Sequence, residues 1–170
     1  MNVLESVSRG ASDGISLALN VGAMLVVFIS LIAIVDALLM KIGVWVNLSE
    51  PLTFSYIAGK VLQPMAWFLG VPWSEAGHVG SLLGKKIILN EFVGYLGLSS
   101  MGSLISDRSV IIASYALCGF ANISSIGIQI GGIGAIAGKN KTTIAQLGLL
   151  AVLGGNLACF LSACIAGLLF

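Results

Sequence analysis

Charged residues are scarce in this 170-residue chain: they make up 9% of it, whereas hydrophobic residues make up 58%. Soluble domains contain about 25% charged residues, and the mean hydropathy of this chain is +1.06. The scarcity excludes an ordinary soluble domain and predicts an integral membrane protein. The formal net charge is +1, so no broad basic surface indicates nucleic acid as a partner and no acidic tail indicates a cationic one.

The groups that enzymes use are also few. His78 is the one histidine, and a lone histidine near a boundary rich in Gly and Pro is usually a surface group. No Ser/His/Asp, Cys/His or paired-carboxylate arrangement is visible. The three cysteines, Cys118, Cys159 and Cys164, lie in apolar runs without a CxxC pair, which favours packing over a metal or redox role. We therefore expect no enzyme, no metal site and no cofactor.

Long uncharged runs are abundant. Residues 15–35 carry no charge over roughly the ~20 positions that a membrane crossing needs. Asp13 and Asp36 bracket this run, and we expect both at the headgroup level without a specific role, since charges at span ends are cheap. Residues 143–170 form another apolar run, with small residues suited to tight helix packing. Both runs are predicted to be transmembrane helices.

Prolines and aromatic residues divide the segment 44–72. Pro51, Pro64 and Pro72 are expected to mark helix boundaries, because the residue before a proline is pushed away from helical geometry. Trp and Tyr concentrate at membrane interfaces. We interpret residues 52–70, LTFSYIAGKVLQPMAWFLG, as an amphipathic helix that lies along the interface and does not cross the membrane.

Four polar residues interrupt the apolar run 79–98: Lys85, Lys86, Asn90 and Glu91. A lipid-facing charge at that depth costs at least about 2.5 kcal/mol, so a simple crossing is excluded. Two half-length arms that meet inside the protein, with Asn90 capping the second arm, would solve the problem. Glu91 would then benefit from the helix dipole. The alternative is a partly solvated helix outside the membrane, with Lys85 and Glu91 exposed to water.

The segment 115–138, YALCGFANISSIGIQIGGIGAIAG, is apolar but carries polar residues in its middle. In a helix, Asn122, Ser125 and Gln129 stand at i, i+3 and i+7 and share one face. The glycines around them predict close packing or a helix that unwinds part way. Polar groups in membrane segments and broken helices are typical of transporter substrate sites. A carboxylate (Glu91), an amide and a hydroxyl suit a ligand rich in hydroxyls, such as a sugar ring.

These residues also resemble a known family. KKIILNEFVGY together with SYALCGFANISSIGIQIGGIGAIA resembles the C-terminal signature of the concentrative nucleoside transporters, and SRGASDGISLALNVGAML is similar to that family's segment before it. The resemblance implies an all-α, multi-pass plasma-membrane protein that imports nucleosides together with a cation, sodium or proton. It implies five parts: a scaffold helix (15–42), an interfacial helix (51–70), a re-entrant hairpin (77–100), a broken helix (109–138) and a last helix (142–170).

The resemblance also implies roles for individual residues. Glu91, Asn122 and Ser125 would hydrogen-bond the ribose hydroxyls, and Phe120 would border the nucleoside. Three more polar residues are candidates for the layer around the site: Asn90, Ser124 and Gln129. For Ser124 and Gln129 there is an alternative, in which they only satisfy backbone groups freed by the break.

The chain departs from the family in length. The first hairpin and its broken helix, expected to contact the nucleobase and hold the coupling cation, have no counterpart in this sequence. We expect a truncated transporter, or a half that needs a separate N-terminal partner, and a homotrimer if complete. The alternative is a non-transporting membrane remnant or an interaction subunit. Nucleoside and membrane lipid are the expected partners, and nucleic acid is not one.

Overall fold

The computed structural model describes residues 2–48, 50–127, 129 and 141–170. Within these ranges every regular element is helical, which confirms the predicted all-α fold class. Residues 123–127 begin a further helical segment between α5 and α7. The named elements are, in chain order, α1 (Val3–Trp45), α2 (Phe54–Phe68), α3 (Trp73–Ile88), α4 (Glu91–Ser99), a 3-10 turn (Gly102–Leu104), α5 (Asp107–Leu117) and α7 (Lys141–Leu169).

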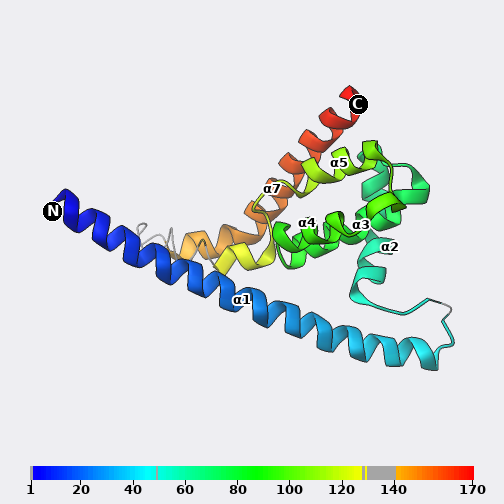
Figure 1. The fold of residues 1–170 in the computed structure, drawn as a ribbon, viewed down its shortest axis with the longest axis horizontal. Helices are drawn as coiled ribbons and strands as arrows, with labels where there is room; N and C mark the ends of the chain where they lie inside the picture. Colours follow the sequence, from blue (N-terminus) through cyan, green and yellow to red (C-terminus); the bar gives the residue numbers. More distant parts are fainter. Residues whose placement is uncertain (1, 49, 128, 130–140) are drawn as a thin grey trace.

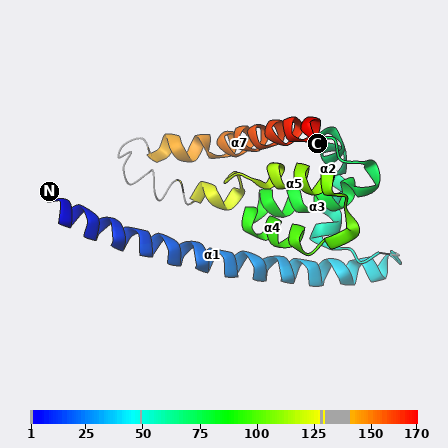
Figure 2. The same cartoon turned by 45° about the horizontal axis from the view of Figure 1, so that its top comes forward.

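Helix α1 runs along one side of the other helices, with the N-terminus at its far end (Figures 1 and 2). It begins at Val3, well before the expected start of the first crossing at residue 15, and the Asn2 side chain caps it by accepting from the Leu4 backbone N–H. Among the described elements, it contacts mainly α2. Asp36 Oδ1 accepts a hydrogen bond from the Phe54 backbone N–H at 2.6 Å. The expectation that Asp36 has no specific role is therefore wrong: it stabilises the start of α2.

Helix α2 passes through Pro64, so the prediction that this proline marks a helix boundary is wrong. A proline inside a helix removes one backbone hydrogen bond and usually kinks the helix. Here α2 is held on both sides of the proline, because Gly59 before it and Ala66 after it are buried. Pro72, in contrast, does mark a boundary, since it directly precedes α3.

Glycines bring α2 and α3 into backbone contact along their length. A side-chain carbon added at Gly80 would lie 2.8 Å from the Gly59 carbonyl oxygen and 3.0 Å from the Gln63 nitrogen. At Gly84 such a carbon would collide with the Ala58 side chain. Backbone atoms cannot move aside as a flexible side chain can. The close contact between α2 and α3, here called the seam, is therefore possible only because these positions are glycines without side chains.

Helices α3 and α4 form a hairpin that turns at Leu89 and Asn90. Gly94 of α4 faces Lys86 of α3, and Gly97 faces Leu82, so the second arm folds back along the first. The Asn90 side chain accepts from the Val93 backbone N–H at 3.0 Å. This confirms the prediction that Asn90 caps the second arm, with Glu91 in its first turn.

Helix α5 ends at Leu117, and residues 118–122 are not helical. Helix α7 packs along α5 (Figure 2). The buried core lies between α3, α5 and α7 and includes Leu82, Leu83, Ile112, Leu117 and Ala163. In the described part of the chain, Thr142–Leu169 is long and apolar enough to cross a membrane: an 18-residue window within it has a mean hydropathy of 2.1, and 28% of that window is buried. The part of the predicted broken helix beyond residue 129 lies outside the described residues.

The seam between α2 and α3 gives a matched pair of substitutions. Gly80→Ala forces backbone atoms apart and should lower the free energy of unfolding by about 1 to 3 kcal/mol. Gly77→Ala, one turn earlier on α3, would meet only Gln63 Cδ at 3.9 Å, so it should be neutral or stabilise the helix by up to about 1 kcal/mol. Thermal unfolding in detergent measures both variants. Equal midpoints for the two variants would contradict the close approach of α2 to α3.

Candidate functional site

Two interruptions in the helices lie next to each other. One is the turn between α3 and α4, and the other is the non-helical stretch 118–122 after α5. The hydroxyl of Ser124, two residues after the second interruption, lies 2.9 Å from the Leu89 carbonyl oxygen at the first. Backbone groups freed at both places are therefore concentrated in one region of the molecule.

Glu91 and Asn122 meet across these interruptions. The Asn122 side-chain amide donates to Glu91 Oε2 at 3.2 Å. Asn122 is fully buried and Glu91 is half-buried. Glu91 also lies in the first turn of α4, where the helix dipole favours an ionised carboxylate. The arrangement presents one carboxylate, partly accessible, with an amide N–H group beside it.

Asn122 directly precedes the helical residues 123–127 and caps them. The sequence pattern predicts that Asn122 and Ser125 share one face of a helix, but Asn122 lies outside the helix. Its Oδ1 accepts from the Ser125 backbone N–H at 2.7 Å. The Ser125 hydroxyl in turn donates to the Asn122 carbonyl oxygen at 2.6 Å. The cap occupies the amide oxygen, which leaves the amide nitrogen on the other side of the group to donate to Glu91. The break thus orients the side chain.

Of the other predicted residues, Ser124 contacts this pair directly. The Ser124 hydroxyl is within hydrogen-bonding distance of the Leu89 carbonyl oxygen (2.9 Å) and of Asn122 Oδ1 (2.7 Å), and its one proton serves one of these acceptors at a time. The first contact is the one expected if Ser124 satisfies a backbone group freed by a break. Gln129 is half-buried. Phe120 lies within the break and is 49% exposed, so its ring is free to cover an apolar ligand surface.

Two residues that sequence reasoning did not select belong to the same cluster. Lys86 on α3 has no exposed surface, and Asn156 on α7 is 6% exposed. The Lys86 ammonium donates to Asn156 Oδ1 at 2.5 Å. A lysine or an asparagine within an apolar helix indicates a candidate functional site. No local pattern, however, predicts a contact between residues 70 positions apart in the sequence.

The cysteines differ from the expectation at one position. Cys118 is exposed, so it is not a packing residue within this chain. Cys159 is buried, and its thiol lies 3.3 Å from the Cys118 carbonyl oxygen, a backbone group of the break. Among the described residues, no group of three or more His, Cys, Asp or Glu side chains could hold a metal ion.

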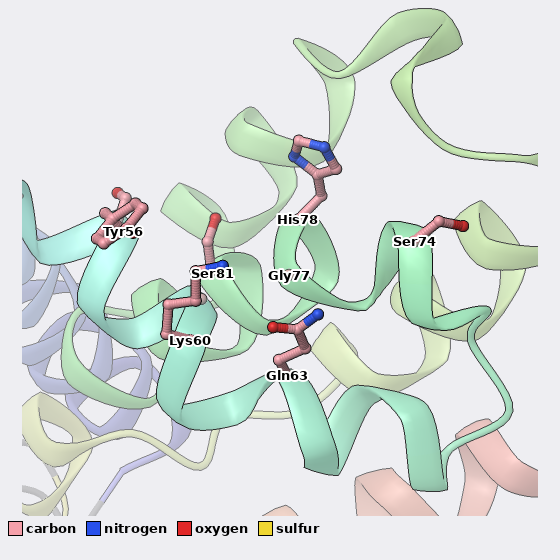
Figure 3. A pocket seen from close by; sticks show the side chains of 9 residues that line it. Tyr56, Lys60, Gln63, Ser74, Gly77, His78 and Ser81 are labelled. Atoms are coloured by element: carbon pink, nitrogen blue, oxygen red, sulfur yellow. The ribbon is translucent and has the colours of Figure 1, made fainter. Parts of the chain in front are cut away.

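A separate polar pocket of about 380 Å³ lies between α2 and α3, as Figure 3 shows. Its lining includes Tyr56, Lys60, Gln63 and His78. His78 is exposed there, as expected of a surface group. The pocket shares no residue with the Glu91–Asn122 cluster, and none of the residues that line it carries a carboxylate. We therefore place the candidate site at the interruptions and not in this pocket.

This chain is apolar and all-helical, and its polar side chains gather where helices break. That combination is typical of membrane transport proteins. The chain belongs to the family described as Na+ dependent nucleoside transporter C-terminus, which matches residues 1–167. This is a family of transporters and not of enzymes, and it places the chain in a membrane.

Individual relatives agree with the family. The chain is 47% identical to the uncharacterized transporter YutK of Bacillus subtilis (strain 168), covering 98% of this chain and 41% of that protein. It is 44% identical to the nucleoside permease NupC of Helicobacter pylori (99% and 41%). It is 37% identical to sodium/nucleoside cotransporter 1 of Oryctolagus cuniculus (99% and 28%). The chain spans about two fifths of the length of the bacterial relatives it matches.

Solved structures agree as well. The structure of CNTnw in an inward-facing substrate-bound state superposes with a TM-score of 0.88 at 41% identity, covering 99% of this chain and 41% of that one. The fold of this chain is therefore that of the matching part of CNTnw.

The two caps offer a matched test of the Glu91 contact. Both Asn90 and Asn122 cap a helix through the side-chain oxygen, and Asp can do the same. Asn122→Asp replaces the donor to Glu91 with a second carboxylate and should lower the free energy of unfolding by about 1 to 3 kcal/mol. Asn90→Asp should change it little. Thermal unfolding compares the two variants, and equal losses would show that Asn122 does not contact Glu91.

Proposed function

We propose that this chain supplies the ribose-binding half of the substrate site in a cation-coupled nucleoside transporter. The observation that carries the proposal is the contact between Glu91 and Asn122 across two helix interruptions. Substrate sites built from discontinuous helices near the bilayer midplane are typical of secondary transporters. The names of the relatives from Helicobacter pylori and Oryctolagus cuniculus support nucleoside as the ligand and, for the latter, sodium as the coupling cation.

The chemistry of the cluster suits vicinal hydroxyl groups. A half-buried carboxylate accepts hydrogen bonds from hydroxyls, and such charge-assisted bonds contribute about 1.5 to 3 kcal/mol. The Asn122 amide nitrogen can donate to a hydroxyl oxygen, since its own oxygen is engaged in the cap. The Ser125 backbone N–H holds the amide through its oxygen, and Phe120, two residues earlier in the chain, is exposed. The ribose would lie against Glu91 and Asn122, with the Phe120 ring bordering the nucleoside.

The fold accommodates this site in a membrane. In the proposed arrangement the hairpin of α3 and α4 is re-entrant and the break after α5 lies inside the bilayer, where irregular backbone is tolerated if protein covers it or it lines a cavity. Helices α1 and α7 cross the membrane, and α2 lies at the interface. Two observations support this: α7 has the length and apolarity of a crossing, and α1 exposes large apolar side chains such as Leu19, Val26 and Ile34.

The remaining functions fall to other parts of the complete transporter. Inverted-repeat transporters place the substrate between two halves, so recognition of the nucleobase and binding of the coupling cation, sodium or proton, are assigned to the half that this sequence lacks. A homotrimer in the plasma membrane is the assembly that the resemblance implies.

A chimera tests the proposal. The complete chain replaces the matching C-terminal part of the Helicobacter pylori permease, which is 44% identical to it, and uridine uptake is measured in cells that lack nucleoside transport. We expect saturable uptake above the vector control. Glu91→Gln should abolish most of it, since removing a charged partner from a partly buried site costs more than the bond itself. Glu50→Gln, on the exposed connection before α2, should have no effect.

Surface expression of each chimera is measured alongside uptake. No uptake by a chimera that reaches the membrane would contradict the transport function and favour a non-transporting remnant or interaction subunit. Full uptake by the Glu91→Gln chimera would remove Glu91 from the site while leaving transport in place.

A further inference from the structure

Lys86 is the largest fully buried side chain in the described part of the chain. A buried ammonium group is strongly unfavourable unless it is paired or hydrogen-bonded. Its direct partner is Asn156 Oδ1, 2.5 Å away, and the Phe160 ring centroid lies 5.8 Å from the ammonium nitrogen. Cys159 lies on α7 between Asn156 and Phe160 in the sequence, the two residues beside the ammonium. Lys86 therefore connects the first arm of the hairpin to helix α7.

The contact with Lys86 determines how the Asn156 amide is oriented. An ammonium group has donors only, so it must face the amide oxygen and not the amide nitrogen. The nitrogen then donates to the carbonyl oxygens of Ala121 (2.9 Å) and Val152 (2.8 Å). If the amide turned around, its N–H groups would face the ammonium and both carbonyl oxygens would lose their donor.

The Ala121 carbonyl belongs to the break and directly precedes Asn122. Helix geometry does not satisfy it, because residues 118–122 are outside the helices. Ala121 also packs on α7, since a side-chain carbon added at Gly155 would lie 2.8 Å from Ala121 Cβ. The hydrogen bond from Asn156 thus fixes the peptide that leads into Asn122.

We infer that Lys86 is a positioning residue for the nucleoside site: it orients Asn156, and through Asn156 it fixes the backbone before Asn122. The inference rests on the proposed function for the identity of the ligand. It ties three elements, the hairpin, the break and α7, into one unit that keeps Glu91 and Asn122 in register. Lys86 does not touch the ligand. Its effect appears in ligand affinity through the geometry of Asn122.

The chain contains a matched control for this test. Lys85 precedes Lys86 on the same helix but is half-buried and projects in a different direction, because neighbouring helix residues differ by about 100°. In the uptake chimera, Lys86→Met should raise the KM for uridine about tenfold, the loss expected when one hydrogen bond in a polar network is removed. The maximal rate per transporter at the surface should stay within about twofold. Lys85→Met should change neither quantity.

A second variant covers the case in which Lys86→Met fails to fold. Asn156→Asp keeps a partner for the ammonium, so the protein should reach the surface, but its two oxygens cannot donate to the Ala121 carbonyl. We expect the KM for uridine to rise about tenfold in this variant too. In the double variant, Lys86→Met with Asn156→Asp, the rise should be smaller than the product of the single effects, because both act on one network.

A measurement without nucleoside separates this inference from the proposed function. Cys159 is buried beside Lys86 and is kept as the sole cysteine by Cys118→Ser and Cys164→Ser. The rate at which N-ethylmaleimide alkylates Cys159 reports how tightly α7 packs there. Alkylation should be slow in the parent and in Lys85→Met. It should be faster in Lys86→Met, because loss of the Lys86–Asn156 contact loosens the packing and admits the reagent. Absent uridine uptake in the parent chimera would overturn the proposed function alone. Unchanged KM in Asn156→Asp, or equal alkylation rates in the Lys86 and Lys85 variants, would overturn the role of Lys86.

Discussion

The hydrogen bond between Asn122 and Glu91 joins two places where a helix stops inside an apolar chain. A helix end leaves backbone groups without partners, and in a membrane such groups cost several kcal/mol each unless protein satisfies them. The chain can keep both interruptions only because side chains take over the lost hydrogen bonds. Asn90 caps α4, Asn122 caps the segment after it, and Ser124 reaches the Leu89 carbonyl oxygen.

The need to satisfy exposed backbone groups also explains how α7 packs against the break. The carbonyl oxygens of Cys118 and Ala121 accept from Cys159 and Asn156 of α7. Helix α7 can come this close because two of its glycines have no side chain there: Gly155 meets Ala121 of the break, and Gly148 meets Ile126 just after it. A polar site therefore exists where the backbone is irregular, and the packing of α7 and the hairpin holds it in shape.

Local signals in the sequence predicted much of this arrangement. The Asn90–Glu91 pair after an apolar helix is a cap signal and needs no tertiary information, and the structure has the cap there. The glycine-rich, polar stretch around Asn122 predicted a broken helix, but its pattern placed Asn122 within a helix, since periodicity does not reveal where the chain unwinds. Pro64 was misread for a similar reason: packing against α3 outweighs the lost hydrogen bond of one proline. The Lys86–Asn156 pair depends on contacts between distant helices, which a single sequence does not contain.

The central claim is that Glu91, placed beside Asn122, recognises the ribose hydroxyls. The most direct test is the ratio of dissociation constants for uridine and 2′,3′-dideoxyuridine, measured on the purified chimera and on its Glu91→Gln variant. If the carboxylate accepts from those hydroxyls, the parent should bind uridine at least about a hundredfold more tightly than the dideoxy compound, and this ratio should fall at least about tenfold in the variant. The same ratio in both proteins would contradict the account, because the hydroxyls would then be recognised without Glu91.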